Sequence, residues 1–489
     1  MAKVFKGVRL EELVRQPYEL KSIHELRAWN LGPDAPPFVE PGEGGPGGPG
    51  GPGGPGGPGG PSGPFGVPSG PSGPAVRIRD GKYYEEESLT QFRYGGTITD
   101  RGAKDLRVVS YGGMVGGVYA EGPGTNFTLS DSTISLSGSG GGPGGTNAGA
   151  AADRGAQLTL KNVQIICNGG HAATSCGGAG VLRVYDSVLA AQGSPFGEDA
   201  PEGSPKMGPP APLEIQGNNR AHCTVENSYS YFYNSTIITD GWAALSTDMA
   251  KGFVYLEAND CRVVATKSGY GAYADYGCHD LFRRCRFDTG CMALICAGQA
   301  DGTFIDCNCT CGTYFALIHC VMGLPVEVGE VTVRRGTIRT KQAVAMIKSQ
   351  NAILDFDGAD ISSECGVLVH TIHNDDPDTT KVRGLRVYGI HIKLKDMDVS
   401  GDIIHEDDER EARVYLTGTQ YCGAIRNAGL IMDAGSRWVA TGDSEIVLGC
   451  DVHDAQIDAL EGVTIRAAGG EAGEYSLPSG GRIIFSEAR

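Results

Sequence analysis

The chain has 489 residues, a formal net charge of −17 and an isoelectric point near 5.1. This acidic balance argues against a nucleic-acid partner, because phosphate binding needs clustered Lys and Arg side chains. Gly is abundant at 76 residues and only 20% of the residues are charged. High Gly content with short Val-, Ile- and Thr-rich runs favours many strands and tight turns over helices.

Residues 1–41 are predicted to form an N-terminal docking segment. The spacing of apolar residues within residues 1–32 indicates two short helical turns, which Pro17 separates. The first 20 residues lack the apolar stretch and small-residue cleavage site of an export signal, and no run approaches about 18 apolar residues. We therefore expect a cytoplasmic protein with no membrane partner, whose 15 cysteines are reduced thiols.

Residues 42–75 form a low-complexity arm, in which Gly44–Pro61 consists of six Gly-Gly-Pro triplets. This composition predicts an extended path of the polyproline-II type. Three interpretations remain open: a short collagen-like triple helix, an extended linker, or a strand lying in a groove. We favour an ordered arm that crosses between subunits, and therefore expect a homo-oligomer, either a dimer or a trimer.

Residues 76–489 contain short strand-like runs with a common shape: alternating apolar residues, a small polar bend, and a second apolar run. Equivalent positions recur at intervals of 21 to 35 residues. This pattern predicts an all-β fold, a right-handed parallel β-helix, with short strands stacked about 4.8 Å apart. It resembles the pectin-lyase-like superfamily over roughly residues 95–480. The resemblance rests on the period, because no family-specific motif is present.

One strand of this repeat is copied most clearly. Its copies begin at Ala243, Gly271, Met292, Phe315, Val344, Gly366 and Gly401. The second and fourth positions are mostly small or apolar, so we expect them to point into the coil, with the third and fifth positions pointing outward. The fifth position forms a predicted external ladder: Thr247, Asp275, Cys296, His319, Lys348, His370 and His405.

This ladder predicts a site for acid and base chemistry. Imidazole groups can exchange protons near neutral pH, and a lysine crowded by histidines can have a lowered pKa. The candidate catalytic residues are Asp275, Cys296, His319, Lys348 and His370. Candidate substrate-binding residues are Tyr273, Tyr276, Leu294, Leu317, Met346 and His405. Polar residues on the outer face of a β-helix are also common for structural reasons, and that alternative stays open.

Metal binding is a second prediction for the ladder. Cys296, His319 and His370 together could hold a divalent transition metal. Cys307, Cys309 and Cys311 alternate along one strand face, where buried packing is favoured over a zinc site. The acidic turns 373–376 and 406–409 are interpreted as solvated loops.

Three classes of function follow from these patterns. We favour a cytosolic enzyme that isomerises, dehydrates or moves a hydroxyl group on a small polyhydroxylated ring, such as a polyphenol or a sugar acid. This class resembles intracellular β-helix enzymes such as the pyrogallol–phloroglucinol isomerases. The alternatives are a polysaccharide lyase or glycoside hydrolase, the commonest activities on this fold, and a trimeric tailspike-like adhesin.

Overall fold

The computed structural model describes residues 3–7, 71–112, 114–137, 145–169, 172–193, 220–248, 253–267, 269–275, 277–319, 328–373 and 389–486. These residues fall into two compact units. The N-terminal unit comprises Val39–Leu294, and the C-terminal unit comprises Ile295–Arg489 with Met1–Phe38. Within the described residues, the elements are strands and three short 3-10 helices, η1 (Glu85–Glu87), η2 (Thr90–Phe92) and η3 (Gly145–Asn147).

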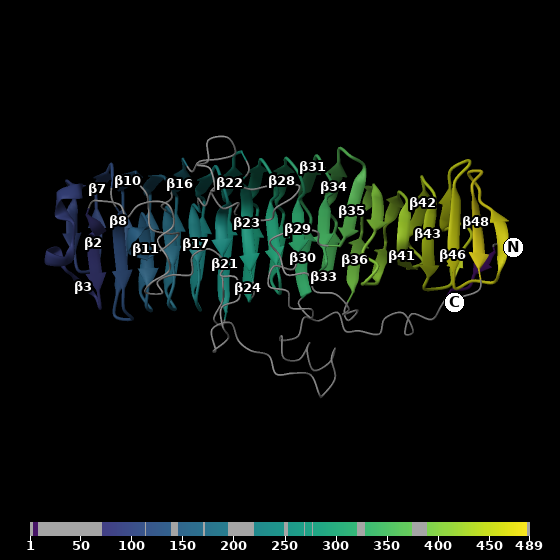
Figure 1. The fold of residues 1–489 in the computed structure, drawn as a ribbon, viewed down its shortest axis with the longest axis horizontal. Coiled ribbons are helices and arrows are strands. Elements are labelled where there is room, and N and C mark those ends of the chain that lie inside the picture. The colour runs from purple at the N-terminus through teal and green to yellow at the C-terminus, as the bar shows by residue number, and fades with distance from the viewer. Residues whose placement is uncertain are drawn as a thin grey trace, which may run out of the picture. The chain divides into compact units, whose positions relative to one another are not determined.

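The N-terminal unit is built from three stacks of parallel strands (Figure 1). The first stack contains β2 (Ser72–Arg79), β8 (Met114–Glu121), β11 (Ala150–Asp153), β14 (Thr174–Cys176), β17 (His222–Thr224), β20 (Ala243–Thr247) and β23 (Tyr270–Asp275). The second contains β6 (Gly102–Lys104), β9 (Asn126–Ser130), β12 (Gln157–Lys161), β15 (Val181–Tyr185), β18 (Tyr229–Tyr233), β21 (Val254–Asn259) and β24 (Cys278–Arg283). The third contains β7 (Arg107–Ser110), β10 (Thr133–Ser137), β13 (Gln164–Asn168), β16 (Val188–Gln192), β19 (Thr236–Thr239), β22 (Arg262–Ala265) and β25 (Arg286–Thr289). Three short strands pair antiparallel at the start of these stacks: β3 (Lys82–Tyr83), β4 (Arg93–Tyr94) and β5 (Thr97–Thr99).

The C-terminal unit repeats the same plan. Its first stack contains β26 (Leu294–Ala297), β29 (Ala316–His319), β32 (Ala345–Lys348), β35 (Val367–Ile372) and β38 (Asp402–His405). Its second contains β27 (Asp301–Ile305), β30 (Val328–Arg334), β33 (Asn351–Asp357), β36 (Ile390–Lys395) and β39 (Ala412–Thr417). β41 (Ile425–Met432) pairs with both β38 and β39, and β43 (Ser444–Leu448), β46 (Thr464–Ala468) and β48 (Arg482–Ser486) follow it.

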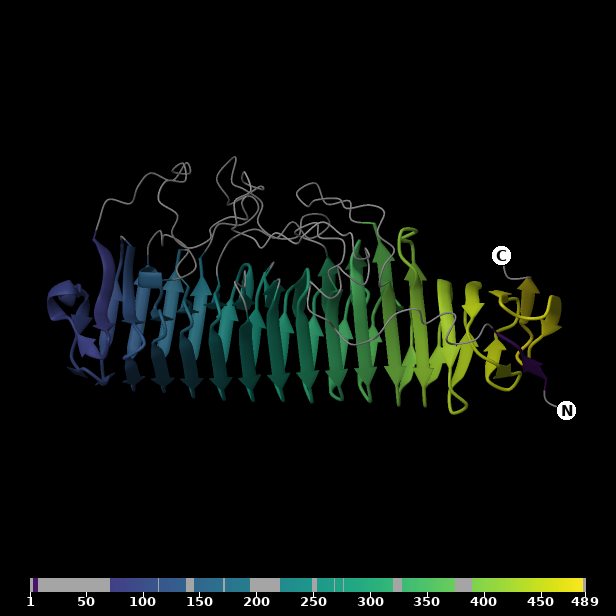
Figure 2. The same ribbon diagram turned by 90° about the horizontal axis from the view of Figure 1, so that it is seen from below.

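The third stack of the C-terminal unit has two parts. The first part contains β28 (Asn308–Cys311), β31 (Thr337–Thr340) and β34 (Asp360–Ser363). The second is a separate sheet of β37 (Asp398–Ser400), β40 (Gln420–Cys422), β42 (Arg437–Ala440) and β45 (Ile457–Ala459). Two antiparallel pairs complete the unit: β1 (Val4–Phe5) with β44 (Val452–His453), and β47 (Gly473–Ser476) with β48. Figure 2 shows the successive strands of each unit from a second direction.

Alternating side chains explain why these short runs form stacks. Strands such as β12, β15 and β18 alternate buried and partly exposed residues, so each turns one apolar face inward. Aromatic residues fill part of this core, and Phe282 packs edge-on against Phe287 with ring centroids 5.1 Å apart. Phe304 and Phe315 form a similar pair in the C-terminal unit. Burial of these apolar faces supplies the main driving force for coiling the chain.

The small polar bends of the sequence mark the turn from the second stack to the third. In the N-terminal unit one residue of each such bend has a φ near +50°: Asp131, Asn162, Asp186, Asn234, Asp260 and Arg284. Asp and Asn adopt this left-handed conformation more readily than most residues. The bend therefore recurs once per turn because its backbone geometry requires it.

The predicted all-β class is confirmed for the described residues, and their parallel stacks form a solenoid compatible with a parallel β-helix. The predicted N-terminal helical segment is not supported, because strand β1 (Val4–Phe5) is the element described there. The apolar positions of the expected helical turns and the Gly-Gly-Pro arm lie outside the described residues.

Candidate functional site

The predicted ladder lies in the first stack, and its best-aligned pair is His319 and Lys348. These two residues are register partners on neighbouring strands β29 and β32. Ile318 and Ile347, the residues before them, also pair. Register partners point to the same face of a sheet, so His319 and Lys348 lie side by side on the face opposite to Ile318.

Other members of the ladder are displaced in register. Lys348 pairs with Ile372, whereas His370 pairs with Met346. This shift is two residues, so His370 keeps the predicted outward direction but stands in the neighbouring column. His405 pairs with Thr371 and therefore faces inward, in contrast to the prediction. A register irregularity between Val367 and Val369 separates this pairing from the regular repeat of the sequence.

Cys296 also faces inward. Its Cβ lies near Gly329, which the Ile318 side chain approaches from the same inner side of the coil. The Cys296 Sγ lies 3.4 Å from the carbonyl oxygen of Ala300. The predicted metal set of Cys296, His319 and His370 is therefore not assembled, because Cys296 and His319 lie on opposite faces of the stack.

The predicted exposure of the ladder is wrong. Asp275, Cys296, His319 and Lys348 are all buried, whereas His370 is partly exposed. The apolar track beside them is buried as well, and it contains Tyr273, Leu294, Leu317 and Met346. A strand pattern specifies the face of a side chain but not what covers that face. Tyr276 lies outside the described residues.

His319 has an unusual environment. It is 3% exposed, and within the described part of the chain neither of its ring nitrogens has a hydrogen-bond partner. Burial, followed by the positive charge of Lys348, lowers the pKa of His319 to about 3. The imidazole is therefore neutral at physiological pH. Buried polar groups without partners are costly and rare in folded proteins, so His319 is a candidate functional residue.

His370 forms an imidazole–carboxylate pair. Its Nε2 lies 2.8 Å from Oε2 of Glu406, and both side chains are partly exposed. Glu406 is anchored through its backbone, because its N–H donates to the carbonyl of Thr371. A carboxylate in this position can fix the orientation of the ring.

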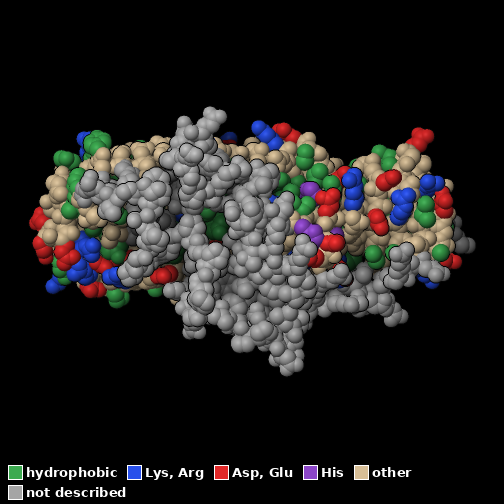
Figure 3. Space-filling model, viewed as in Figure 1, with side chains coloured by type: hydrophobic (Ala, Val, Ile, Leu, Met, Phe, Trp, Pro, Cys, Tyr) green, Lys and Arg blue, Asp and Glu red, His purple; other side chains and the backbone are tan. Residues whose placement is uncertain are grey.

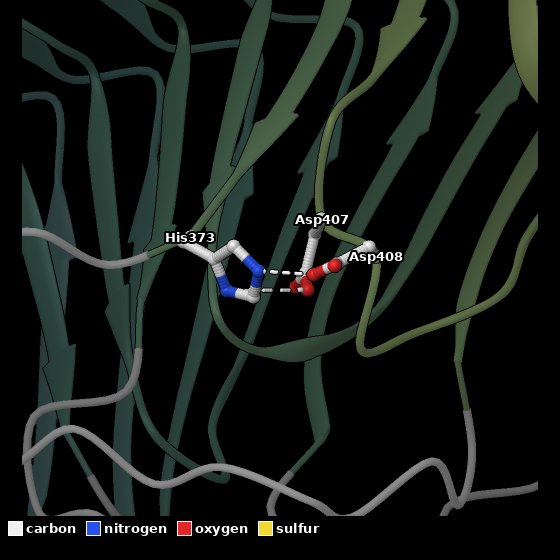
Figure 4. Close-up of side chains that lie close together, drawn as sticks. All are labelled: His373, Asp407 and Asp408. Carbon is white, nitrogen blue, oxygen red and sulfur yellow. Dashed lines mark hydrogen bonds and ion pairs between the residues drawn. The ribbon is translucent and has the colours of Figure 1, made fainter.

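A second imidazole lies beside two carboxylates. His373 contacts Asp408 through Nε2 and lies 3.6 Å from Asp407 through Nδ1 (Figure 4). Asp407 is buried, and its other oxygen lies 2.8 Å from the guanidinium of buried Arg410. His373 therefore contacts the acidic turn 406–409, and the interpretation of this turn as a solvated loop is wrong for Asp407. Figure 3 shows histidine side chains beside acidic ones on this part of the surface.

His405 supports this cluster from within. Its Nδ1 contacts the Thr371 hydroxyl, and its Nε2 donates to the carbonyl oxygen of Arg410 at 2.8 Å. Burial lowers its pKa. The predicted substrate-binding role does not suit this position, because both ring nitrogens are engaged inside the coil.

One group of described residues has the composition and spacing of a cation site. The ligand atoms of His373, Asp407 and Asp408 all lie within 4.8 Å of one another. An imidazole with carboxylates suits a divalent transition metal. Arg410 already balances the charge of Asp407, so a bound ion would compete with this ion pair.

The N-terminal unit holds a different polar cluster in its first stack. Buried Arg220 lies 3.1 Å from Asp248, and its guanidinium lies 4.7 Å from the ring centroid of Trp242. Trp242 packs against both Tyr270 and Tyr273. Arg220 and Asp248 were not predicted as site residues, because neither belongs to a recognisable motif.

A signal for the C-terminal cluster was present in the sequence. His370 and His373 end one strand copy, and Glu406, Asp407 and Asp408 end the next. Parallel strands bring equivalent ends together, so histidines after one copy and acids after the next predict contact between them.

No model of a known protein family matches the chain, and no curated protein matches it. Among the residues that the structure describes, no helix is long and apolar enough to cross a membrane.

Proposed function

We propose that this chain is an enzyme of the right-handed parallel β-helix class, related in architecture to the pectin-lyase-like proteins. Its substrate would be a small polyhydroxylated ring, and its reaction an isomerisation, hydroxyl migration or elimination. The reaction site would lie on the outer face of the first stack in the C-terminal unit, at His319, Lys348 and His370.

The observation that carries this proposal is the buried His319 imidazole, whose ring nitrogens have no hydrogen-bond partner among the described residues. A protein tolerates such a group where a ligand supplies the missing hydrogen bonds. A neutral imidazole can donate one hydrogen bond to a substrate oxygen and accept another from a hydroxyl group. A ring bearing adjacent hydroxyl groups offers both kinds of partner.

Lys348 and His370 supply complementary chemistry. A positive charge beside the substrate would stabilise negative charge that develops on an oxygen during proton abstraction. His370, oriented by Glu406, would act as the proton carrier. The apolar side chains of Leu317 and Met346 occupy the neighbouring column and would contact the face of the ring.

A divalent cation fits this proposal at His373, Asp407 and Asp408. When bound there, it would polarise a substrate oxygen. Metal analysis of the purified protein and of a His373→Ala variant tests this part separately. Equal metal content in the two proteins would contradict it.

The experiment for the reaction is proton NMR in D₂O with pyrogallol and with galacturonate as probes. Deuterium incorporation at ring carbon or loss of the substrate signal reports proton transfer. We expect wild type to convert at least one probe, and His319→Gln and Lys348→Met to lose about 100-fold or more in rate, as for loss of acid–base catalysis.

His453→Gln is the matched control, because His453 is exposed and lies on β44, away from these residues in sequence. It should retain full activity. No conversion of either probe by wild type, or equal rates in folded His319→Gln and wild type, would contradict the proposal.

A further inference from the structure

Tyrosines are concentrated on one face of the second stack in the N-terminal unit. Five of them are partly exposed at outward positions on three consecutive strands, β15, β18 and β21: Tyr185, Tyr229, Tyr231, Tyr233 and Tyr255. The residues between them are buried in the core, for example Ser230 and Phe232 on β18. Alternation along each strand therefore places all five rings on the same outer surface.

The strand register arranges these rings into columns. Tyr229 pairs with Tyr255, and Tyr185 pairs with Tyr233. The rings of Tyr185 and Tyr233 are stacked, with centroids 5.0 Å apart and an interplanar angle of 9°. The ring centroids of Tyr231 and Tyr255 lie 5.9 Å apart. The ring contacts on these three strands form two groups, one of Tyr185 with Tyr233 and one of Tyr231 with Tyr255.

Phe253 extends this surface at one end. Its side chain is among the exposed large apolar groups of the described residues, at 44% exposure. It stacks on His279, with ring centroids 4.5 Å apart, and lies nearly parallel to Tyr255. Contiguous exposed apolar patches mark binding surfaces, and Phe253 adds to the patch that the tyrosines form.

Hydrogen-bonding groups lie between the rings. Glu257 pairs in register with Tyr231 and accepts hydrogen bonds from the Tyr255 hydroxyl at 2.9 Å and from Asn259 at 3.0 Å. The Arg183 guanidinium lies 5.9 Å from the Tyr231 ring centroid. Charges of both signs thus accompany the rings, and the face has no strong net charge of its own.

A surface hollow borders the same face. It has a volume of about 470 Å³, and Arg183 and Tyr185 belong both to its lining and to the tyrosine face. The other lining residues are polar: Thr159, Lys161, Asn162 and Asp186. Its volume is in the range of small-molecule sites.

These features together favour a chain of sugar rings as the occupant. A sugar ring presents an apolar C–H face that packs on an aromatic ring, and hydroxyl groups that both donate and accept hydrogen bonds. The tyrosine rings would pack on the C–H face of the sugar. Glu257, Arg183 and the tyrosine hydroxyls would form hydrogen bonds with its hydroxyl groups. A protein partner would require a larger aliphatic area, whereas Val181 and Leu281 are the aliphatic side chains at these outward positions.

We infer that the outer face of the second stack in the N-terminal unit is a glycan-binding surface, centred on Tyr231 and Tyr233. This inference does not rest on the proposed function, because it shares no residue with the His319 site and is tested by binding alone.

The test is affinity electrophoresis of the full chain in gels containing hydroxyethylcellulose, a neutral glucan, or polygalacturonate, an acidic one. We expect retardation by at least one polymer, and the two gels distinguish neutral from acidic sugars. Tyr231→Ala and Tyr233→Ala should each weaken binding about tenfold, as for loss of a central contact residue. Tyr231→Phe keeps the ring and should retain most of the binding.

Tyr111→Ala is the matched control, because Tyr111 is 85% exposed and belongs to none of these columns. It should bind like wild type, and thermal unfolding should show that all variants are folded. Absence of retardation by both polymers, or equal retardation of wild type and Tyr231→Ala, would overturn the inference. Concentration-dependent self-association that Tyr231→Ala abolishes would instead identify the face as a contact between copies of the chain.

Discussion

Three cysteines of the repeat take the place of serines at the position that follows the left-handed bend. Ser187 and Ser235 follow a left-handed bend, and each hydroxyl donates to the carbonyl two residues earlier. Cys261, Cys285 and Cys307 occupy the same position and direct Sγ to the carbonyls of Asn259, Arg283 and Ile305. Hydrogen bonding to Cys285, followed by burial, raises the pKa of Cys261, so the Cys261 thiol is suited to packing and not to nucleophilic chemistry.

Two fully buried tyrosines, Tyr270 and Tyr421, should respond differently to replacement by Phe, as measured by the free energy of unfolding. The Tyr270 hydroxyl has no hydrogen-bond partner among the described residues, whereas the Tyr421 hydroxyl donates to the carbonyl of Gly401 at 2.7 Å. Removing an unsatisfied buried group is neutral or stabilising, and removing a satisfied one leaves a carbonyl with fewer partners. We expect Tyr270→Phe to leave the free energy of unfolding unchanged or raise it by about 1 kcal/mol, and Tyr421→Phe to lower it by about 1–2 kcal/mol. Urea unfolding of the two variants measures both values, and an equal loss in both would contradict this account.

At the scale of the element, the bend between the second and third stacks limits which residues the repeat accepts. Asn162 has a φ of 50°, and its side-chain amide donates to Asp131, the equivalent residue one turn earlier, at 2.8 Å. A β-branched residue is strained in this conformation, whereas Gly is not. We expect Asn162→Val to lower the free energy of unfolding by about 1–2 kcal/mol and Asn162→Gly to cost less than half of that. Thermal unfolding compares the two variants, and a more stable Val variant would show that the left-handed bend is not required.

Strand register is the feature of the fold that was predicted least well from the sequence. Apolar columns aligned His319 with Lys348 correctly, because both strands have the same length and no insertion. The same columns misplaced His405, because a register irregularity in β35 shifts the pairing by one residue. Irregularities of this kind change the face of a side chain and leave the apolar pattern almost unchanged.

For the whole molecule, the period of the sequence was sufficient to predict stacked parallel strands and their bends. Side-chain direction in the ladder was predicted in part: His319, Lys348 and His370 face outward as expected, and Cys296 and His405 do not. The roles of these residues stay predictions. Burial could not be predicted, because the pattern within a strand specifies the face of a side chain and not its exposure. The contact between His373 and Asp407 follows from the order of histidines and acids in neighbouring strand copies, whereas the buried Arg410–Asp407 ion pair was not predicted.

We propose that His319 is a buried neutral imidazole whose ring nitrogens form hydrogen bonds to a hydroxylated ring. Nitrogen-15 NMR of labelled histidine, assigned with His319→Gln, measures both properties directly. A pKa of about 3 means that the ring stays neutral as the pH falls from 8 to 5, a range in which a free imidazole becomes protonated. We predict this behaviour, together with a shift of the His319 signals when pyrogallol or galacturonate is added at pH 7. Titration of His319 near pH 6.5, with no response to either compound, would contradict the account.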